Sequence, residues 1–571
     1  MAAATPISMN MLDRYLKQTR IAYFTMEIAL RPEMHTYSGG LGGLAGDTAR
    51  SCADLELPVL FVSLVTRAGY MRQEIDLQGH QTDRPAPWDP ARWTQPLGAK
   101  IAVTIAGREV WIRPWLYLIR GITGYDTPVI LLDTDLEENA PEDRRITDSL
   151  YGGDRVYRLK QEVVLGIGGV RILRALGFEI DTYHMNEGHS ALLVTELLRR
   201  FTRPANGDGA CADIARVREA CIFTTHTPVE AGHDQFGYDL VERVLNGSVD
   251  LEMLKRFGGR ERLNMTLLAM NLSGYVNGVA KRHAETSRRM FPGYEVHAVT
   301  NGVHSGTWAS PGFAHLFDAH FPDWRHDSEV LFRAVTLPDA EVWAAHREAK
   351  QQLLHRVRDV TGVTMDPELP LIGFARRMTG YKRANLLFQD PDRLRAIARR
   401  RPFQVVLAGK AHPHDEDGKR IIQLIHQRMH ELRDAIPIAF LPDYDMDLAR
   451  VIVAGSDVWL NTPVPPLEAS GTSGMKAALN GVLNLSTLDG WWVEACIEGE
   501  TGWAIGDGTP GSSIERDAGL LYDKLEGTVL ELYAHDRARW IWMMKQAISR
   551  IGSYFNTHRM MRRYAAEAYL R

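Results

Sequence analysis

Cysteine is scarce in this chain of 571 residues, which contains only Cys52, Cys211, Cys221 and Cys496. No two of them have the C-x-x-C spacing, so the sequence predicts neither a zinc ribbon nor a disulfide framework. We expect reduced thiols and a cytoplasmic protein. Long apolar runs are also missing, and none reaches the roughly 20 residues that cross a bilayer. Residues 1–13 lack the order of charged, apolar and small residues that marks a signal peptide.

An excess of positive charge is absent too. The formal net charge is -5, and the basic stretches, such as 376–377 and 399–401, are too short to form one stripe. We therefore expect no nucleic acid partner. Hydrophobic residues make up 45% of the chain and charged residues 24%, which is typical of a folded globular protein. Because the length exceeds that of one ordinary domain, we expect two or three domains.

Short apolar runs alternate with amphipathic helical stretches along almost the whole chain, which predicts an α/β fold with parallel sheets built from βαβ units. The expected strands fall into two sets. The first comprises residues 21–24, 58–64, 110–112, 129–132, 220–224 and 295–299, and the second 371–375, 403–407, 437–441, 458–460 and 481–485. A stretch rich in aromatic residues and loop formers, residues 305–339, separates the two sets.

We therefore predict two doubly wound, Rossmann-like domains that face each other across a cleft. The expected boundaries are residues 1–320 for the first domain and 321–539 for the second, and a helical tail, 540–571, packs back on the first. In open α/β sheets, ligands bind at the carboxyl ends of strands. Glycine-rich or charged segments follow expected strands in both halves, so the active site should lie between the domains.

The segment from Glu468 to Lys476 is a run of small residues that ends in one lysine at the expected start of a helix. Such a loop lets backbone N–H groups approach an anion, and the start of a helix adds a positive potential. A lysine there can form a Schiff base with an aldehyde whose phosphate lies nearby. Taken alone, the same pattern is more often a solvated helix lysine behind a flexible loop.

Three other segments follow expected strands. Arg376, Arg377 and Lys382 place three cations within one turn, where they can converge on a phosphate, although such a turn alone is more often solvated. The glycine-rich segment 36–45 can form an anion cradle or a tight turn without a ligand. In the segment 224–227 a single histidine, His226, is by itself more often structural.

Together these segments resemble the glycogen/starch (α-glucan) phosphorylases. The lysine segment is similar to that family's E-A-S-G-T-x-x-M-K, the basic turn to K-R-x-H-E-Y-K-R, the glycine-rich turn to G-N-G-G-L-G-R-L-A, and 224–227 to T-N-H-T. Further matches, such as 158–162 and 186–189, follow in the same order, from about residue 36 to the tail at 559–564. The pair Trp491-Trp492 is most similar to the short prokaryotic members.

The resemblance implies the GT-B architecture and reversible, retaining phosphorolysis of α-1,4-glucan or maltooligosaccharide by inorganic phosphate, which gives glucose 1-phosphate. A homodimer would fit. The implied catalytic residues are Arg376, Arg377, Lys382 and His226. Pyridoxal 5'-phosphate would form a Schiff base with Lys476 and contact Gly40, Trp308, Tyr444, Gly471, Thr472 and Ser473. Substrate contacts would come from Gly39, Leu41, Asp154, Glu187, His189, Asn301, Tyr381, Glu468 and Ser470.

Departures from the family pattern leave two alternatives open. Asp445 stands where similar enzymes have an arginine that helps to hold the cofactor, so a carbohydrate-binding homologue without activity is one of them. The other is a nucleotide-sugar glucosyltransferase of the glycogen synthase type. Its glycine loop carries a lysine where this chain has Thr36 or Ser38, which favours phosphorolysis. The His412–Asp417 cluster is nearly consecutive and interrupted by proline, so we expect no metal site. We also expect no activation by nucleotides.

Overall fold

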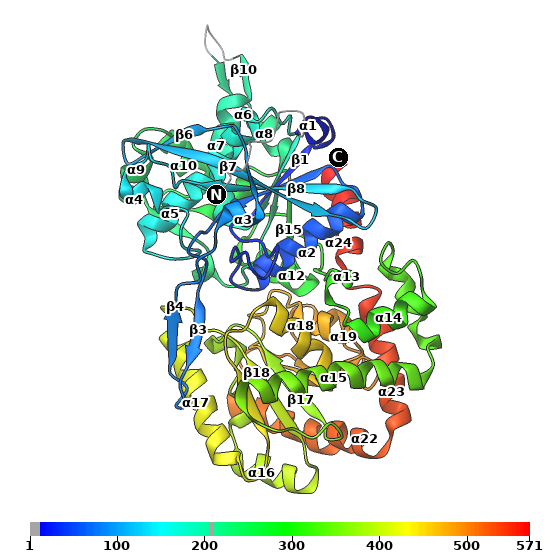
Figure 1. Cartoon of the computed structure of the whole chain (residues 1–571). Coiled ribbons are helices and arrows are strands. Elements are labelled where there is room, and N and C mark those ends of the chain that lie inside the picture. The colour runs from blue at the N-terminus through cyan, green and yellow to red at the C-terminus, as the bar shows by residue number, and fades with distance from the viewer. Residues whose placement is uncertain (1–11, 205–209, 571) are drawn as a thin grey trace.

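The computed structural model describes residues 12–204 and 210–570. Two lobes are stacked in Figure 1, one built mainly from the first half of the chain and the other from the second half. Both lobes combine a largely parallel sheet with many helices, as the alternating sequence pattern predicts. Among the described residues, no helix combines the length and apolar character needed to span a membrane.

The first lobe contains a ten-stranded sheet in the order β16-β15-β12-β9-β1-β2-β8-β7-β5, with β6 paired to β7. The seven strands from β16 to β8 are parallel, whereas β7 pairs antiparallel with β8, β5 and β6. Their bounds are β1 Ile21–Phe24, β2 Val59–Leu64, β5 Gln95–Pro96, β6 Ile101–Ile105, β7 Arg108–Arg120, β8 Asp126–Asp133, β9 Thr182–Asn186, β12 Cys221–Thr224, β15 Tyr275–Gly278 and β16 His297–Ala298.

The second lobe contains a six-stranded, fully parallel sheet in the order β19-β18-β17-β20-β21-β22. Counted from its first strand, this is the order 3-2-1-4-5-6, so the direction of winding changes between β17 and β20. The bounds are β17 Leu371–Ala375, β18 Gln404–Ala408, β19 Ile438–Leu441, β20 Val458–Asn461, β21 Leu483–Thr487 and β22 Gly502–Ile505.

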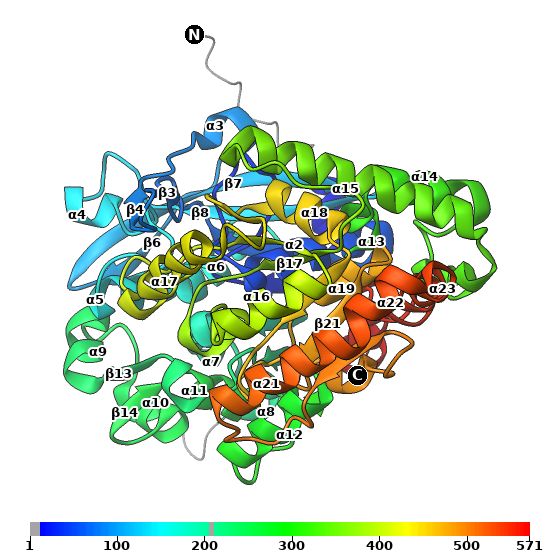
Figure 2. The same ribbon diagram turned by 90° about the horizontal axis from the view of Figure 1, so that it is seen from below.

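Each sheet is buried on both faces, because successive residues of a strand point to opposite sides. In β1, Ala22 and Phe24 pack into one hydrophobic core while Ile21 and Tyr23 pack into another. The second sheet divides β17 between two cores in the same way. Figure 2 shows helices of the second lobe covering its sheet. They are α15 Asp339–Thr361, α16 Pro391–Arg400, α17 Glu416–Leu432, α18 Met446–Gly455, α19 Ser473–Leu479, α21 Ile514–Lys524, α22 Leu530–His535 and α23 Arg537–Ala547.

The helices of the first lobe cover its sheet in the same manner. The longest is α2, Gly40–Asp54, which follows β1 directly. The others include α5 Arg155–Val163, α6 Gly169–Ala175, α7 Leu193–Arg200, α8 Ile214–Ala220, α9 Tyr238–Leu245, α10 Leu251–Gly258, α11 Met265–Asn271 and α12 Lys281–Met290.

The chain passes between the lobes twice, and the two passages lie side by side. The Val303 N–H donates to the Phe555 carbonyl at 3.0 Å, and the Thr557 N–H donates to the Val303 carbonyl at 3.0 Å. In the tail, α24 (Thr557–Tyr564) packs with α2 in the first lobe, whereas α23 belongs to the core of the second. The expected domain boundaries remain a prediction.

A hairpin reaches from the first lobe to the second on the side away from these passages. Its strands are β3 (Arg72–Ile75) and β4 (Gln81–Arg84), which lie beside α17 in Figure 1. The Gln73 amide donates to the Gly409 carbonyl at 2.9 Å, and the Gln81 amide donates to the Ala411 carbonyl at 2.8 Å. The lobes are therefore joined at both ends of the space between them.

The expected separator, residues 305–339, is mostly helical. It contains α13 (Ser305–Trp308), α14 (Pro311–His320) and a 3₁₀ segment, Ser328–Thr336. Pro311 occupies the first turn of α14, a position that tolerates proline because its missing N–H has no helix acceptor there. Most aromatic side chains of the stretch pack into the core of the second lobe, whereas Phe332 is exposed. The buried ones are Trp308, Phe313, Phe317, Phe321 and Trp324.

Candidate active site

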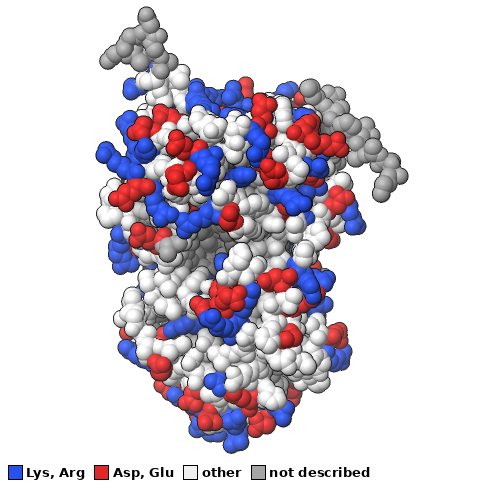
Figure 3. Space-filling model, turned by 90° about the vertical axis from the view of Figure 1, so that its left-hand side faces the viewer, with Lys and Arg blue, Asp and Glu red and all other residues white. Residues whose placement is uncertain are grey.

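A cavity of about 830 Å³ lies between the two sheets. Figure 3 shows the surface hollowed between the lobes, with positive and negative side chains interspersed around it. Every residue that the sequence singled out as a candidate lines this cavity. They are Gly39, Gly40, Leu41, Asp154, Glu187, His189, His226, Asn301, Trp308, Arg376, Arg377, Tyr381, Lys382, Tyr444, Glu468, Ser470, Gly471, Thr472, Ser473 and Lys476. The structure thus brings together segments that are more than 400 positions apart in the sequence.

Strand topology explains why these loops meet. In the second sheet, the basic turn follows β17 and the small-residue loop follows β20, the two strands between which the winding changes direction. In the first sheet, the glycine-rich turn follows β1, and the segment with Glu187 follows β9, which pairs with β1. The carboxyl ends of such neighbouring strands leave a crevice that α/β proteins use for ligands.

Arg376 and Lys382 converge on one carboxylate. The Arg376 Nη2 donates to Glu468 Oε2 at 2.9 Å, and the Lys382 ammonium bonds to the same oxygen. Two further donors of Arg376, Nε and Nη1, are buried and have no partner. Because buried polar atoms are normally satisfied, these N–H groups predict a polar ligand in the cavity. A guanidinium is suited to a phosphate, since its fork matches two oxygens.

The pKa of Lys382 is lowered to about 8, mainly because burial disfavours the charged amine and also because Arg376 lies nearby. Glu468 opposes this effect, and its own pKa is lowered by Arg376 and Lys382 despite burial. Behind Glu468, its backbone N–H donates to Asp489 Oδ2 at 2.8 Å. Burial raises the pKa of Asp489 to about 6. Arg377, by contrast, is exposed on the rim.

Lys476 lies in α19 and points at an aromatic wall. Its Nζ is 3.6 Å from the centroid of the Trp308 indole ring. A Cβ on Gly43 of α2 would come within 4.0 Å of this Nζ, so α2 packs closely against the lysine. Burial lowers the pKa of Lys476 to about 8, which makes its neutral amine accessible near neutral pH.

The glycine-rich turn is shaped by a carboxylate that the sequence reading did not single out. Glu27 Oε2 accepts from the backbone N–H of Ser38 at 2.6 Å and of Gly39 at 3.2 Å, and Oε1 accepts from the Tyr151 hydroxyl at 2.9 Å. Gly39 is therefore already bonded. The next N–H groups belong to the first turn of α2, where no helix carbonyl can accept them, and this turn lines the cavity.

His226 is anchored on two sides. Its backbone N–H donates to Glu187 Oε2 at 2.7 Å, and its Nε2 pairs with Asn186 Oδ1 at 2.6 Å. Burial lowers the pKa of His226 to about 3, so the ring is neutral. Glu187 Oε2 also accepts from the Thr227 hydroxyl at 3.0 Å, so this carboxylate orients the loop by accepting two of its hydrogen bonds.

The far side of the cavity carries further polar groups from the first lobe. His189 approaches Asp234 at 3.6 Å, and Asp234 pairs with Arg158 at 2.9 Å. His189 Nδ1 and Asn301 Oδ1 are buried without a partner, which suits a ligand rich in hydroxyl groups. Asp154 caps α5 through the Tyr157 N–H at 2.9 Å and lies at the exposed edge of the cavity.

The remaining candidates belong to the wall beside Lys476. Gly471 has a φ of 83°, which glycine adopts without strain, and Ser473 Oγ accepts from the Trp459 indole at 3.1 Å. Tyr444 is half-buried, and burial raises its pKa. Asp445, which stands where similar enzymes have an arginine, caps α18 by accepting from the Leu448 N–H at 2.8 Å, and this gives it a structural role.

These surroundings fit an aldehyde cofactor that carries a phosphate. Lys476 is half-buried, its amine faces the cavity, and the small side chains of the loop 471–473 leave room beside it. The unpaired N–H groups of Arg376 supply positive charge in the same cavity. The roles predicted for individual residues stay predictions.

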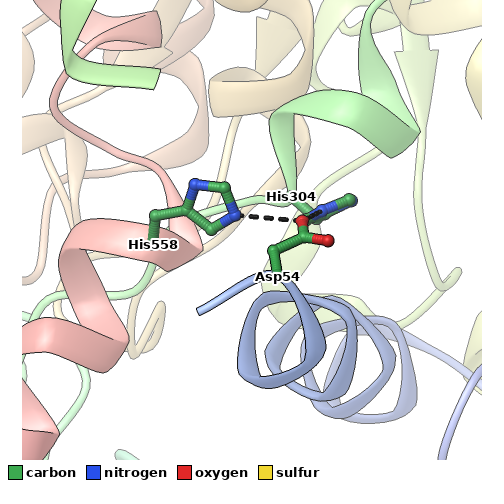
Figure 4. Close-up of side chains that lie close together, drawn as sticks. All are labelled: Asp54, His304 and His558. Atoms are coloured by element: carbon green, nitrogen blue, oxygen red, sulfur yellow. Dashed lines mark hydrogen bonds and ion pairs between the residues drawn. The ribbon is translucent and has the colours of Figure 1, made fainter. Parts of the chain in front are cut away.

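One group of potential metal ligands occurs in the part of the chain that the structure describes: Asp54, His304 and His558. Figure 4 shows both histidines directed at one carboxylate, with Nε2 to Oδ2 distances of 2.7 Å for His304 and 3.1 Å for His558. These are ordinary hydrogen-bond lengths. The group lies outside the cavity and ties α2 to both passages between the lobes.

Comparison with known proteins gives consistent similarities. The family model described as carbohydrate phosphorylase matches residues 248–503. The chain is 38% identical to maltodextrin phosphorylase from Thermococcus litoralis, over 96% of this chain and 70% of that protein. It is 35% identical to glycogen phosphorylase from Aquifex aeolicus, over 98% and 87%, and 36% identical to glycogen phosphorylase from Mycobacterium tuberculosis, over 96% and 71%.

Proposed function

Because the chain belongs to the carbohydrate phosphorylase family, we propose that it is an α-1,4-glucan phosphorylase with pyridoxal phosphate bound to Lys476. The reaction is the reversible transfer of a terminal glucosyl unit from an α-1,4-glucan or maltooligosaccharide to inorganic phosphate. One observation carries the proposal: the largely buried cations Arg376 and Lys382 share a cavity with Lys476, a half-buried lysine whose amine faces that cavity.

The proposed architecture is GT-B, with two doubly wound, Rossmann-like domains facing each other. The 3-2-1-4-5-6 order of the second sheet supports this assignment for the second domain. In the first sheet the parallel strands run outward from β1 in both directions, which supports it there. The cavity then lies where the two switch points face each other.

In the proposed reaction, Arg376 and Lys382 hold the substrate phosphate and stabilise its charge as the glycosidic bond breaks. Preorganised donors of this kind are among the largest contributions to catalysis. The substrate phosphate itself can donate a proton to the leaving oxygen and attack the glucosyl carbon, so no pair of catalytic carboxyl groups is needed. In agreement with this, Glu468 and Glu187 are both committed as hydrogen-bond acceptors.

The glucosyl unit would lie against the loop of His226, with Asn301 and Ser470 available for its hydroxyl groups. Glu468 would exchange part of its contact with the two cations for sugar hydroxyls. When bound, pyridoxal phosphate would supply a second phosphate group that can exchange a proton with the substrate phosphate. Lys476 would hold it covalently, with Tyr444 and the loop 471–473 around it.

The synthetic direction gives a direct test. The protein should be incubated with maltooligosaccharide and glucose 1-phosphate, and in parallel with uridine or adenosine diphosphate glucose. We expect longer chains and release of phosphate in the first reaction and no extension in the others. Extension from a nucleotide sugar alone would favour the glucosyltransferase alternative, and no reaction in any arm would favour a carbohydrate-binding protein.

A further inference from the structure

We propose that Asp47 is a positioning residue for Lys476. Asp47 holds the Trp308 indole under the lysine amine and places a carboxylate beside that amine. The inference rests on the proposed function, because it concerns how this chain prepares Lys476 for pyridoxal phosphate. Asp47 belongs to α2 and does not line the cavity, so it acts through its neighbours.

One face of α2 carries the residues involved. Gly43, Asp47 and Asp54 are spaced by four and seven positions, so they lie along one side of the helix. Gly43 faces Lys476, since a Cβ there would lie 4.0 Å from Nζ, at ordinary van der Waals contact. About two turns further along α2, Asp54 accepts hydrogen bonds from His304 and His558. The helix therefore presents Asp47 between the lysine and the passages of the chain.

Asp47 fixes Trp308 by a short hydrogen bond. Its Oδ2 accepts from the Trp308 Nε1 at 2.7 Å and from the His304 backbone N–H at 3.2 Å. The same indole ring also contacts Lys476, whose Nζ is 3.6 Å from the ring centroid. Such a distance allows a favourable interaction between the ammonium group and the aromatic face.

The backbone on the other side of the lysine is equally fixed. Asn480 is fully buried and donates to the carbonyls of Trp308 and Lys476, both at 2.9 Å. Its Oδ1 accepts from the Ser310 N–H at 2.7 Å. Because the main chains of Trp308 and Lys476 are joined in this way, the orientation of the indole decides what the amine faces.

One carboxylate oxygen of Asp47 is not engaged by a hydrogen bond or a close ion pair. Its side chain is buried, Oδ1 has no hydrogen-bond partner, and the nearest cation, Arg50, lies 3.8 Å away. The charged groups that face Lys476 are Asp47 on α2 and Arg450 on α18. Asp47 favours the ammonium form, whereas Arg450 and, above all, burial oppose it and lower the pKa of the lysine to about 8.

Replacing Asp47 by Asn keeps an oxygen that can accept from the indole but removes the charge. The pKa of Lys476 should then fall further, by about one unit, because an opposite charge nearby typically shifts a pKa by that much or more. The neutral amine at pH 7 would rise from roughly one tenth to roughly one half of the molecules. Covalent loading with pyridoxal phosphate at pH 7 should be about fivefold faster in Asp47→Asn.

The experiment starts from the loaded full-length protein. The cofactor is removed with hydroxylamine, pyridoxal phosphate is added back, and the growth of the cofactor absorbance is followed between about pH 6 and pH 10. Wild type should show a midpoint near 8 and Asp47→Asn a lower one, with equal rates at high pH. Borohydride reduction and peptide mapping confirm that Lys476 carries the label.

Asp54→Asn is the matched control, since it removes another buried carboxylate from the same helix face without touching Trp308. It should lower thermal stability but leave the midpoint of loading unchanged. Asp47→Ser replaces Asp47→Asn if the latter does not fold, and Asp47→Glu should restore the wild-type midpoint. Coincident pH profiles for wild type and Asp47→Asn would overturn the inference. Failure of wild type itself to take up the cofactor would instead overturn the proposed function.

Discussion

Replacing Lys382 by Ala removes one of the two cations that face the substrate phosphate in the proposed reaction. Loss of one preorganised donor typically costs about 3 to 4 kcal/mol in the transition state, so we expect turnover to fall about a hundredfold to a thousandfold. The fold should survive, because Glu468 keeps Arg376 as a partner at 2.9 Å and is not left as an unpaired buried charge.

The pH profile sharpens this prediction. Burial lowers the pKa of Lys382 to about 8, so wild-type activity should decline as pH rises above 8 and the amine loses its proton. Lys382→Arg keeps a permanent charge and should lose this decline while retaining part of the activity. Initial rates of glucose 1-phosphate formation give both quantities, and cofactor absorbance confirms loading.

Lys419→Ala serves as the matched control, because this lysine lies outside the cavity and pairs with Asp83 and Glu416. It should have wild-type turnover. A near-normal rate in Lys382→Ala, or an unchanged decline above pH 8 in Lys382→Arg, would refute the role assigned to this amine.

Three further changes have distinct expected results. Arg377→Ala should lower turnover about a hundredfold with cofactor content unchanged, whereas a solvated arginine would have no effect. Lys476→Ala should abolish covalent labelling by pyridoxal phosphate and borohydride, which peptide mapping would show; a label on another lysine contradicts the assignment. Asp489→Asn tests how protonation of this carboxyl group is linked to the stability of the fold. Because burial raises the pKa of Asp489 from 3.8 to about 6, the folded state binds the extra proton between these values, and wild-type stability should fall as pH rises through them. Relative to the variant, this loss should approach about 3 kcal/mol in urea unfolding, and parallel curves would contradict it.

Strands with continuous apolar runs were predictable from the sequence. Residues 21–24 and 371–375 coincide with β1 and β17, because four or five apolar or small residues in a row are buried on both faces. The strand β9 was missed, since Thr182–Asn186 has a polar residue at every second position and no continuous apolar run. His184 is buried there only because its ring nitrogens bond to Tyr569 and Thr224, partners that local sequence cannot reveal.

The residues of the candidate site likewise divide into those that the sequence reveals and those that it does not. Glycine-rich and basic segments behind strands, such as Arg376 to Lys382, could be found because their composition is unusual and topology gathers strand ends. Asp47 could not, since an aspartate within a helix has no local signature and its partner Trp308 is far along the chain. Glu27 lies three residues after β1, so its place at a strand end was the one available signal.

The most direct test of the account is phosphorolysis followed by phosphorus NMR. Maltooligosaccharide and inorganic phosphate are incubated with the loaded wild-type protein, without any nucleotide. We predict a new resonance of α-glucose 1-phosphate that grows as phosphate is consumed, and none with Lys476→Ala. Formation of the β-anomer would contradict retention, and release of free glucose, or no phosphate-dependent product, would contradict the assignment as a phosphorylase.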